Sequence, residues 1–270
     1  MNIFKILDDL QKVDGDAIGR IDHATRRMFM NRIGSTLAAA AVPTVFASIV
    51  NKAYAASATP LEVLNFALTL EYLEETFYFQ ANRTPGLIPG MYSLVFSQIE
   101  KHETQHVQFL QGALGKDAVK RLNYDFTAGG KFPTMTDFPT FVTVASAFED
   151  TGVRAYKGQA GNLISTPQLL EYALQVHSVE ARHASITRRI LGKLTSNPML
   201  KGWITEDKPV NPAVAPVYAG EGNTTHLAID VATLAGIGAI TRANVTEAFD
   251  EPLEMADVLK IAGPFIVGPK

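Results

Sequence analysis

One pattern of glutamates and histidines occurs twice in the middle of this chain. A Glu-x-x-His motif stands at 103–106 and again at 180–183. Each motif follows a lone glutamate by nearly the same distance, 32 positions in the first copy and 31 in the second. Each lone glutamate is followed, seven residues on, by a tyrosine. The residues of the doubled pattern are Glu71, Tyr78, Glu103, His106, Glu149, Tyr156, Glu180 and His183.

The residues around each motif have the spacing of helices packed in a bundle. Helices are predicted at 60–82, 90–114, 139–159 and 167–194. In the last of these, alternating steps of four and three residues define one largely apolar face. That face consists of Leu169, Ala173, Val176, Glu180, His183, Thr187, Ile190 and Leu194. The ionisable side chains therefore lie on faces that a bundle would bury.

Capping and turn residues delimit these helices. Thr59-Pro60-Leu61-Glu62 is typical of a capping box with proline at the first helical position, and Gly115 is a suitable end for the second helix. The Asn-, Gly- and Pro-rich segment 115–137 then reads as one long crossover between two helical hairpins. The sequence predicts an all-α fold: a four-helix bundle over 56–195 and a C-terminal extension over 196–270, which packs on the bundle. Two or three short helices are expected near 225–240 and 252–262.

Four carboxylates converging in one core require cations. A buried, unpaired carboxylate costs several kcal/mol, or takes up a proton instead. Two divalent ions would balance four carboxylates and leave both histidines neutral. The three-residue spacing puts the glutamate and histidine of each motif on one face of a helix, where both reach one site. The six Glu and His residues are therefore predicted to bind two metal ions per chain.

Several neighbouring residues compete for these roles. Glu74 and Glu75 stand beside Glu71, but only Glu71 lies a full heptad from Tyr78, so Glu71 is the preferred ligand. Tyr78 and Tyr156 are either core tyrosines or hydroxyl donors that bond a metal-bound carboxylate or histidine. His102 is expected to face away from the site or to pack at an end of the bundle.

The composition limits the kind of metal and of partner. The chain has no cysteine, which excludes disulfides, iron–sulfur clusters and thiolate-bound zinc. Oxygen-rich sites with one imidazole per ion favour iron or manganese over structural zinc. The formal net charge is −3, and no basic stripe is present, so a nucleic-acid partner is not expected.

Residues 1–55 resemble a targeting segment. Arg26-Arg27 precede an alanine-rich apolar stretch at 33–50, and a small-x-small site follows at Ala53 and Ala55. This order resembles a twin-arginine export signal, and it predicts the twin-arginine machinery as a partner and a periplasmic or otherwise exported location. The alternative, an uncleaved membrane anchor, is disfavoured by Pro43 and by the modest hydrophobicity of the stretch.

At these residues the chain resembles the ferritin-like superfamily of di-iron and di-manganese carboxylate proteins, which includes rubrerythrins, ferritins and manganese catalases. The resemblance covers roughly 60–194, with all six ligand positions filled. It implies that Glu71 and His106 hold one metal, that Glu149 and His183 hold the other, and that Glu103 and Glu180 bridge them. Segments 65–74 and 247–253 further resemble exported ferritin-like domain proteins related to desiccation-associated proteins.

The favoured functional hypothesis is an exported di-metal oxidoreductase that uses iron or manganese on O2 or peroxide, as a ferroxidase or in peroxide detoxification and stress protection. A manganese catalase is the nearest alternative among enzymes. A non-catalytic stress or structural protein, stabilised by its metals, is the alternative of a different class. A homo-oligomer is compatible with the pattern, although a 75-residue extension disfavours a storage shell.

Overall fold

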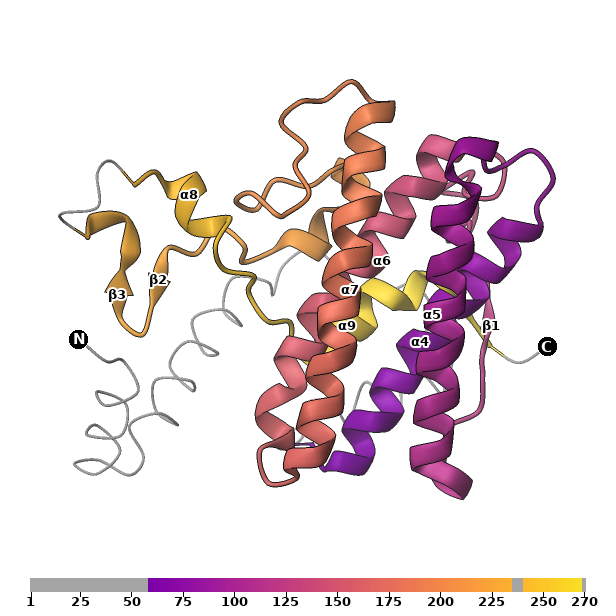
Figure 1. Cartoon of the computed structure of the whole chain (residues 1–270), viewed down its shortest axis with the longest axis horizontal. Coiled ribbons are helices and arrows are strands. Elements are labelled where there is room, and N and C mark those ends of the chain that lie inside the picture. Colours follow the sequence, from indigo (N-terminus) through magenta and orange to yellow (C-terminus); the bar gives the residue numbers. More distant parts are fainter. Residues whose placement is uncertain (1–57, 235–239, 269–270) are drawn as a thin grey trace.

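Four long helices form the centre of the molecule (Figure 1). The computed structural model describes residues 58–234 and 240–268, so the predicted export signal lies outside the described residues. The helices are α4 (Pro60–Arg83), α5 (Gly90–Leu114), α6 (Phe138–Gln159) and α7 (Pro167–Leu194). α4 packs along α5 and α6 along α7, as two hairpins, and α4 also packs against α6. This confirms the predicted all-α bundle with one long crossover.

Local sequence explains where these helices begin and end. The hydroxyl of Thr59 accepts a hydrogen bond of 3.3 Å from the backbone N–H of Glu62, and the Glu62 carboxylate accepts one of 2.9 Å from the Thr59 N–H. The predicted capping box is thus present. α5 ends at Leu114, and the residue that caps it, Gly115, has a φ of +55°, which favours glycine. α6 begins one residue before the predicted position, because Asp137 caps it through the Thr140 N–H at 2.9 Å.

An aromatic cluster fills the core between the helices. The ring of Phe77 on α4 lies 5.0 Å from that of Phe141 and 5.1 Å from that of Phe148, both on α6. Phe126, from the crossover between α5 and α6, approaches the same ring at 5.2 Å. The crossover is therefore held against the bundle by burial of its own side chains.

The C-terminal extension packs on α6 through α9 (Met255–Ala262) and returns to the crossover. β4 (Ile266–Val267) pairs antiparallel with β1 (Asn123–Tyr124). Leu253, Val258 and Leu259 are almost completely buried in the same core cluster as the bundle residues. The other short elements are η1 (Gly115–Asp117), η2 (Ala160–Leu163), η3 (Pro212–Tyr218), η4 (Val231–Thr233), α8 (Arg242–Thr246) and η5 (Gly263–Phe265).

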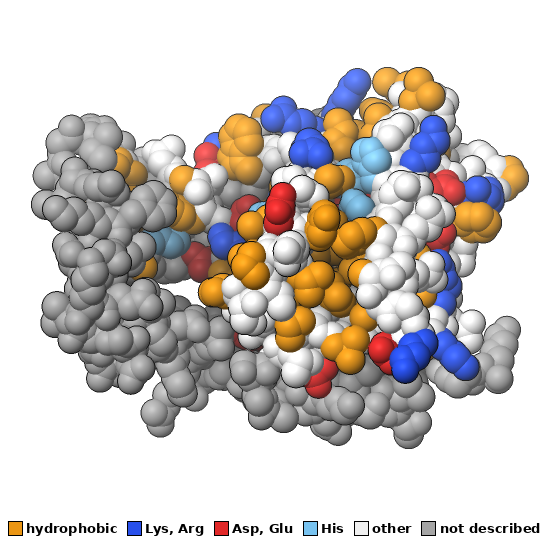
Figure 2. Space-filling model, turned by 60° about the horizontal axis from the view of Figure 1, so that its bottom comes forward, with side chains coloured by type: hydrophobic (Ala, Val, Ile, Leu, Met, Phe, Trp, Pro, Cys, Tyr) orange, Lys and Arg blue, Asp and Glu red, His pale blue; other side chains and the backbone are white. Residues whose placement is uncertain are grey.

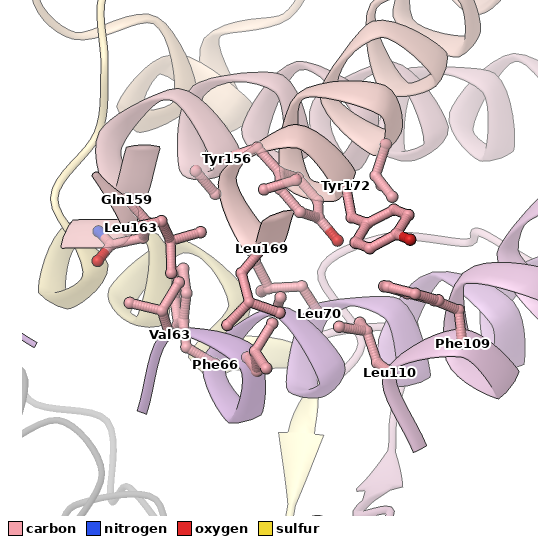
Figure 3. Close-up of a pocket in the computed structure, with 15 residues that line it drawn as sticks. Val63, Phe66, Leu70, Phe109, Leu110, Tyr156, Gln159, Leu163, Leu169 and Tyr172 are labelled. Atoms are coloured by element: carbon pink, nitrogen blue, oxygen red, sulfur yellow. The ribbon is translucent and has the colours of Figure 1, made fainter. Parts of the chain in front are cut away.

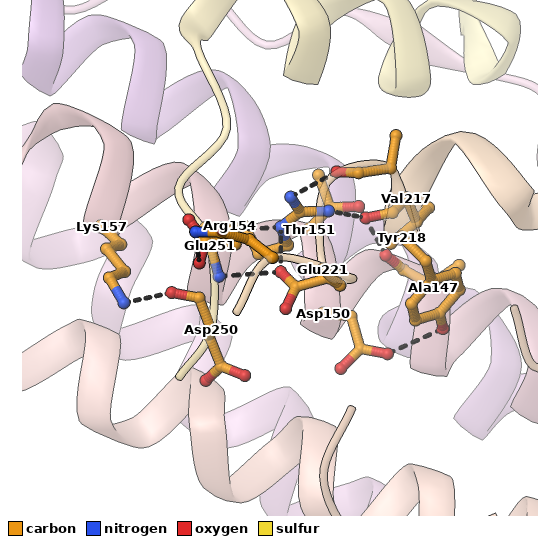
Figure 4. A network of polar contacts seen from close by, with 12 residues as sticks. Ala147, Asp150, Thr151, Arg154, Lys157, Val217, Tyr218, Glu221, Asp250 and Glu251 are labelled. Carbon is orange, nitrogen blue, oxygen red and sulfur yellow. Dashed lines mark hydrogen bonds and ion pairs between the residues drawn. The ribbon is translucent and has the colours of Figure 1, made fainter. Parts of the chain in front are cut away.

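A buried polar network joins α6 to this extension (Figure 4). The fully buried guanidinium of Arg154 lies 2.7 Å from the Glu221 carboxylate and donates to the backbone carbonyls of Ala219, at 2.7 Å, and Glu251, at 2.8 Å. One turn earlier, Asp150 accepts hydrogen bonds of 2.8 Å from Tyr218 and from Arg188. The extension is thus fixed to the bundle by charge pairs as well as by apolar contacts.

Among the described residues, the expectation of short helices near 225–240 is met only by the single turn of η4, and the residues before it form a different structure. Residues 225–230 form a hairpin, with β2 (Thr225–His226) paired to β3 (Ile229–Asp230). Leu227 and Ala228 between them have φ values of 52° and 62°, the pair of left-handed residues that a two-residue hairpin loop requires. Helix near 252–262 is confirmed by α9. Across the described segments, no helix is both long and apolar enough to span a membrane.

Candidate metal centre

The six predicted ligands converge at the centre of the bundle. α4 and α6 each contribute one glutamate, and α5 and α7 each contribute a glutamate and a histidine one turn apart. The four carboxylates are fully buried, and the two imidazoles are at most 9% exposed. Two overlapping groups form, and within each the potential ligand atoms lie within 4.8 Å of one another. The groups are Glu71, Glu103, His106 and Glu180, and Glu103, Glu149, Glu180 and His183.

The first group is arranged around one nitrogen of His106. Its Nδ1 lies 3.1 Å from Glu71 Oε2, 3.0 Å from Glu103 Oε2 and 3.3 Å from Glu180 Oε1. Three carboxylate oxygens from three different helices therefore meet at one imidazole. This nitrogen can make only one linear hydrogen bond at a time, so three acceptors at this distance exceed what a proton on it can satisfy.

The second group is arranged in the same way around His183. Its Nδ1 lies 2.9 Å from Glu103 Oε1 and 3.3 Å from Glu149 Oε2. The carboxylate of Glu103 thus faces His106 with one oxygen and His183 with the other. Glu180 also belongs to both groups. Glu103 and Glu180 are therefore placed as the shared residues of a two-part site.

Several of these atoms are close to one another without being hydrogen-bonded. The buried atoms that lack a hydrogen-bond partner among the described residues include Glu103 Oε1, Glu149 Oε2, both oxygens of Glu180 and His183 Nδ1. His183 Nδ1 and Glu103 Oε1 are only 2.9 Å apart, yet their angle does not suit a hydrogen bond. Lone pairs that converge in this way fit a cation between them. The donor set therefore fits hard or borderline metal ions.

The two tyrosines each reach a ligand on the opposite helix. Tyr78 on α4 donates its hydroxyl hydrogen bond to Glu149 Oε1 on α6. Tyr156 on α6 donates to Glu71 Oε1 on α4, at 2.5 Å. Burial, followed by the charge of the bonded glutamate, raises the pKa of both hydroxyls, so that both stay protonated and remain donors. Each hydroxyl orients one lone glutamate and leaves its second oxygen facing a histidine.

Two residues near the site were not assigned to it from the sequence. His102 was expected to face away, but its Nδ1 lies 2.8 Å from His183 Nε2, and the two rings stack with centroids 5.1 Å apart. A hydrogen bond on Nε2 frees Nδ1 of His183 to face the carboxylates. The signal for this contact is weak, because His102 is directly beside Glu103 and not on the predicted apolar face.

Glu74 is a fifth buried carboxyl group, although it is not among the converging ligand groups. A Cβ atom on Gly152 of α6 would lie 3.2 Å from Glu180 Oε2 and 3.4 Å from Glu74 Oε1, so both carboxyl groups use the space that this glycine leaves. Burial, together with the charges of Glu180 and Glu149, raises the pKa of Glu74 well above its ordinary value. Glu75 instead pairs with Arg121 at the surface.

In the metal-free site, burial and neighbouring charges shift the pKa values of the predicted ligands. Burial raises the pKa of Glu103 to about 7, against the opposing effect of the two neighbouring histidines. Burial lowers the pKa of His183, but the charge of Glu149 and the neighbouring carboxylate of Glu103 outweigh it and raise the value to about 11. Without metal, protons on these carboxylates and imidazoles therefore offset the negative charge of the site.

The fold and the buried Glu and His groups define a class of protein. A model of the ferritin-like domain family matches residues 59–193, which is half of the chain and spans all four long helices. The chain belongs to this family. A comparison with curated proteins gave no match.

Proposed function

We propose that this protein binds two iron or manganese ions per chain and uses them to reduce O2 or peroxide. The observation that supports the proposal most directly is the set of buried carboxylate oxygens and the His183 nitrogen that converge with no hydrogen-bond partner among the described residues. Leaving so many polar atoms unpaired in a core is too costly for a merely structural arrangement without cations.

Each residue has a defined part in this proposal. Glu71 and His106 hold one ion and Glu149 and His183 the other, while Glu103 and Glu180 contact both. When bound, iron or manganese supplies electrons to the oxygen substrate. Tyr78 and Tyr156 keep their glutamates in place, and the apolar residues around the site exclude water. Oxygen ligands with one imidazole per ion suit iron and manganese better than the softer metals.

The test combines metal content with turnover. The mature protein is loaded anaerobically with Fe(II) or Mn(II), the metal per chain is measured by elemental analysis, and O2 or peroxide consumption is then followed with excess Fe(II) supplied as the electron donor. We expect two ions per chain and more than one turnover. Two bound ions without turnover would support instead the non-catalytic, metal-stabilised alternative. Peroxide disproportionation by the manganese form alone would support the catalase alternative.

Ligand variants test the site itself. Glu103→Ala and Glu180→Ala remove a residue shared by both ions, so each should lower the content of both, whereas Glu71→Ala should lower mainly one. Glu171→Ala, at an exposed glutamate of α7, is the matched control and should retain both ions. Full metal content in both Glu103→Ala and Glu180→Ala would rule out the assignment.

We propose further that residues 1–55 direct export through the twin-arginine route, as the sequence of Arg26-Arg27 and the following apolar stretch suggests. That route carries folded proteins, so metal would be loaded in the cytoplasm, away from competing copper and zinc. The resemblance of 65–74 and 247–253 to exported desiccation-associated proteins supports a role in stress protection. Replacing both arginines with lysine should retain the protein in the cytoplasm, as cell fractionation would show. Export of the double variant would contradict this route.

A further inference from the structure

An apolar cavity lies inside the bundle between the metal centre and one end of the helices (Figure 3). All four long helices contribute to its wall. Leu70 comes from α4, Leu110 from α5, Tyr156 from α6 and Leu169 from α7. In Figure 3 the side chains of Tyr156, Tyr172 and Phe109 gather at one end of the cavity, and those of Val63, Gln159 and Leu163 at the other.

Residues of the cavity wall stand next to the predicted metal ligands along their helices. Ala67, Leu110 and Val176 line it, and each stands one helical turn from a ligand: Glu71, His106 and Glu180, respectively. Tyr156 contacts both the cavity and a ligand. Its side chain lines the cavity, and its hydroxyl donates a hydrogen bond to Glu71 Oε1. An occupant at this end would therefore touch side chains that position the metals.

The size and lining of the cavity restrict its occupant. It offers about 20 Å³ to the centre of a water-sized molecule, where one water needs roughly 10–15 Å³. A buried water also needs two to four polar partners, which an almost wholly apolar lining does not provide. A substituent as large as an aromatic ring or an alkyl chain does not fit this space. The chemistry that fits is a small apolar molecule with two or three atoms.

Two residues at the same end of the cavity as Tyr156 lead toward solvent. Phe109 on α5 and Tyr172 on α7 are 37% and 44% exposed, and their rings contact each other with centroids 5.2 Å apart. Figure 2 shows hydrophobic side chains gathered in a band on one face of the molecule, with histidine side chains at its upper end.

We propose that this cavity holds dioxygen beside the metal centre and that Phe109 and Tyr172 form its entrance. This deepens, and rests on, the proposed reaction with O2 or peroxide: it assigns O2, which is apolar and small, to the cavity. Peroxide is polar, carries two hydrogen-bond donors and is excluded by the same lining. On this proposal O2 reaches the metal centre through the cavity, and peroxide does not.

Xenon tests the cavity without metal or activity, because it is a small apolar atom that occupies dry cavities. Crystals or solutions of the mature protein under xenon pressure should show one xenon bound among Leu70, Leu110 and Leu169. Ala173→Val fills the cavity from α7 with two methyl groups and should abolish this binding. Gln175→Val introduces the same side chain at an exposed position of the same helix and should leave it intact. Ala67→Val is the second cavity variant if Ala173→Val does not fold.

Kinetics then connect the cavity with the reaction. In iron-loaded protein, the cavity variant that has lost xenon should react with O2 severalfold more slowly, while its reaction with peroxide and its metal content stay at the wild-type level. An unchanged O2 rate in that variant would overturn the proposal, as would failure of xenon to enter the wild-type protein or an extractable alkyl chain in the cavity. If the metal-loaded protein reacts with neither oxidant while xenon still binds, the proposed function fails and the gas-binding cavity stands.

Discussion

Tyr156 on α6 donates a hydrogen bond of 2.5 Å to Glu71 on α4, and so bonds the lone glutamate of the other copy of the repeated pattern. Tyr78 on α4 donates to Glu149 on α6 in return. Two hydrogen bonds thus cross between the same two helices in opposite directions. They link the halves of the site before any metal arrives, and they leave one oxygen of each glutamate facing its histidine.

The crossed hydrogen bonds predict that Tyr156→Phe weakens metal binding without unfolding the protein. Glu71 would lose the donor that fixes its orientation, and loss of such a partner typically lowers metal affinity about 10–100-fold. Competition with a chelator of known affinity measures the change. Tyr92→Phe, at a half-buried tyrosine of α5 away from the ligands, serves as the control. Equal affinities in Tyr156→Phe and wild-type protein would show that this hydroxyl has no orienting role.

His102 is expected to support the second ion through its contact with His183. His102→Phe preserves a stacked ring but removes the nitrogen that lies 2.8 Å from His183 Nε2. The His183 ring would then lack the hydrogen bond that selects its tautomer, and metal affinity should fall by about 10–100-fold at one of the two positions only. Stepwise metal titration separates the two positions. A uniform loss at both, or none, would contradict this assignment.

The metal-free protein should be less stable at pH 8 than at pH 5. The pKa of Glu103 is raised from 4.5 to about 7, so between these values the folded protein keeps a proton that the unfolded chain loses, and the free energy of unfolding falls as pH rises. The pKa of His183 is raised from 6.5 to about 11, which lowers the free energy of unfolding further above pH 6.5. The lowered pKa of Glu71 acts the other way, but only below 4.5.

Urea unfolding with a chelator present measures this effect, and the expected midpoint is higher at pH 5 than at pH 8. Metal-loaded protein should not show the trend, because metal ions replace the protons and stabilise the folded state by mass action. A higher midpoint for the metal-free protein at pH 8 would mean that its buried carboxylates are not held in the protonated form.

Arg154→Met should destabilise the protein by about 3–5 kcal/mol, because it leaves the fully buried Glu221 carboxylate without its partner. Adding Glu221→Leu should recover part of this loss, since a buried pair replaced by apolar side chains is often nearly neutral. Chemical denaturation of both variants gives the two values. An Arg154→Met loss below about 1 kcal/mol, which is typical of exposed ion pairs, would contradict the burial of this network.

The sequence predicted the parts of the site that depend on helical periodicity. Glu71, Glu103 and His183 fall on the heptad faces of their helices, and such faces are buried whatever the details of packing. Glu71 was chosen over Glu74 on this ground, and the structure places Glu71 in the converging group. Glu74 is buried as well, because Gly152 on α6 leaves room for it, and no pattern within α4 reports a glycine on another helix.

Contacts across helices could not be read from spacing. Tyr78 lies seven residues after Glu71 along the same face, yet its hydroxyl reaches Glu149 on α6, because two helical turns, about 10.5 Å, separate it from Glu71 on its own helix. The hairpin at 225–230 was missed for another reason. Its loop places Leu227 and Ala228 at positive φ, where sequences usually have Asn or Gly, so the turn lacks its normal signal.

The burial of Leu253, Val258 and Leu259 in the bundle core has a consequence for how the chain is divided into units. The family match ends at residue 193, but burial of each of these three side chains in the same hydrophobic core as Phe77 and Phe141 contributes about 1.5–3 kcal/mol. A fragment cut at the family boundary would present that core to water. The segment that the family model recognises is therefore shorter than the segment whose side chains build the core around the metal centre.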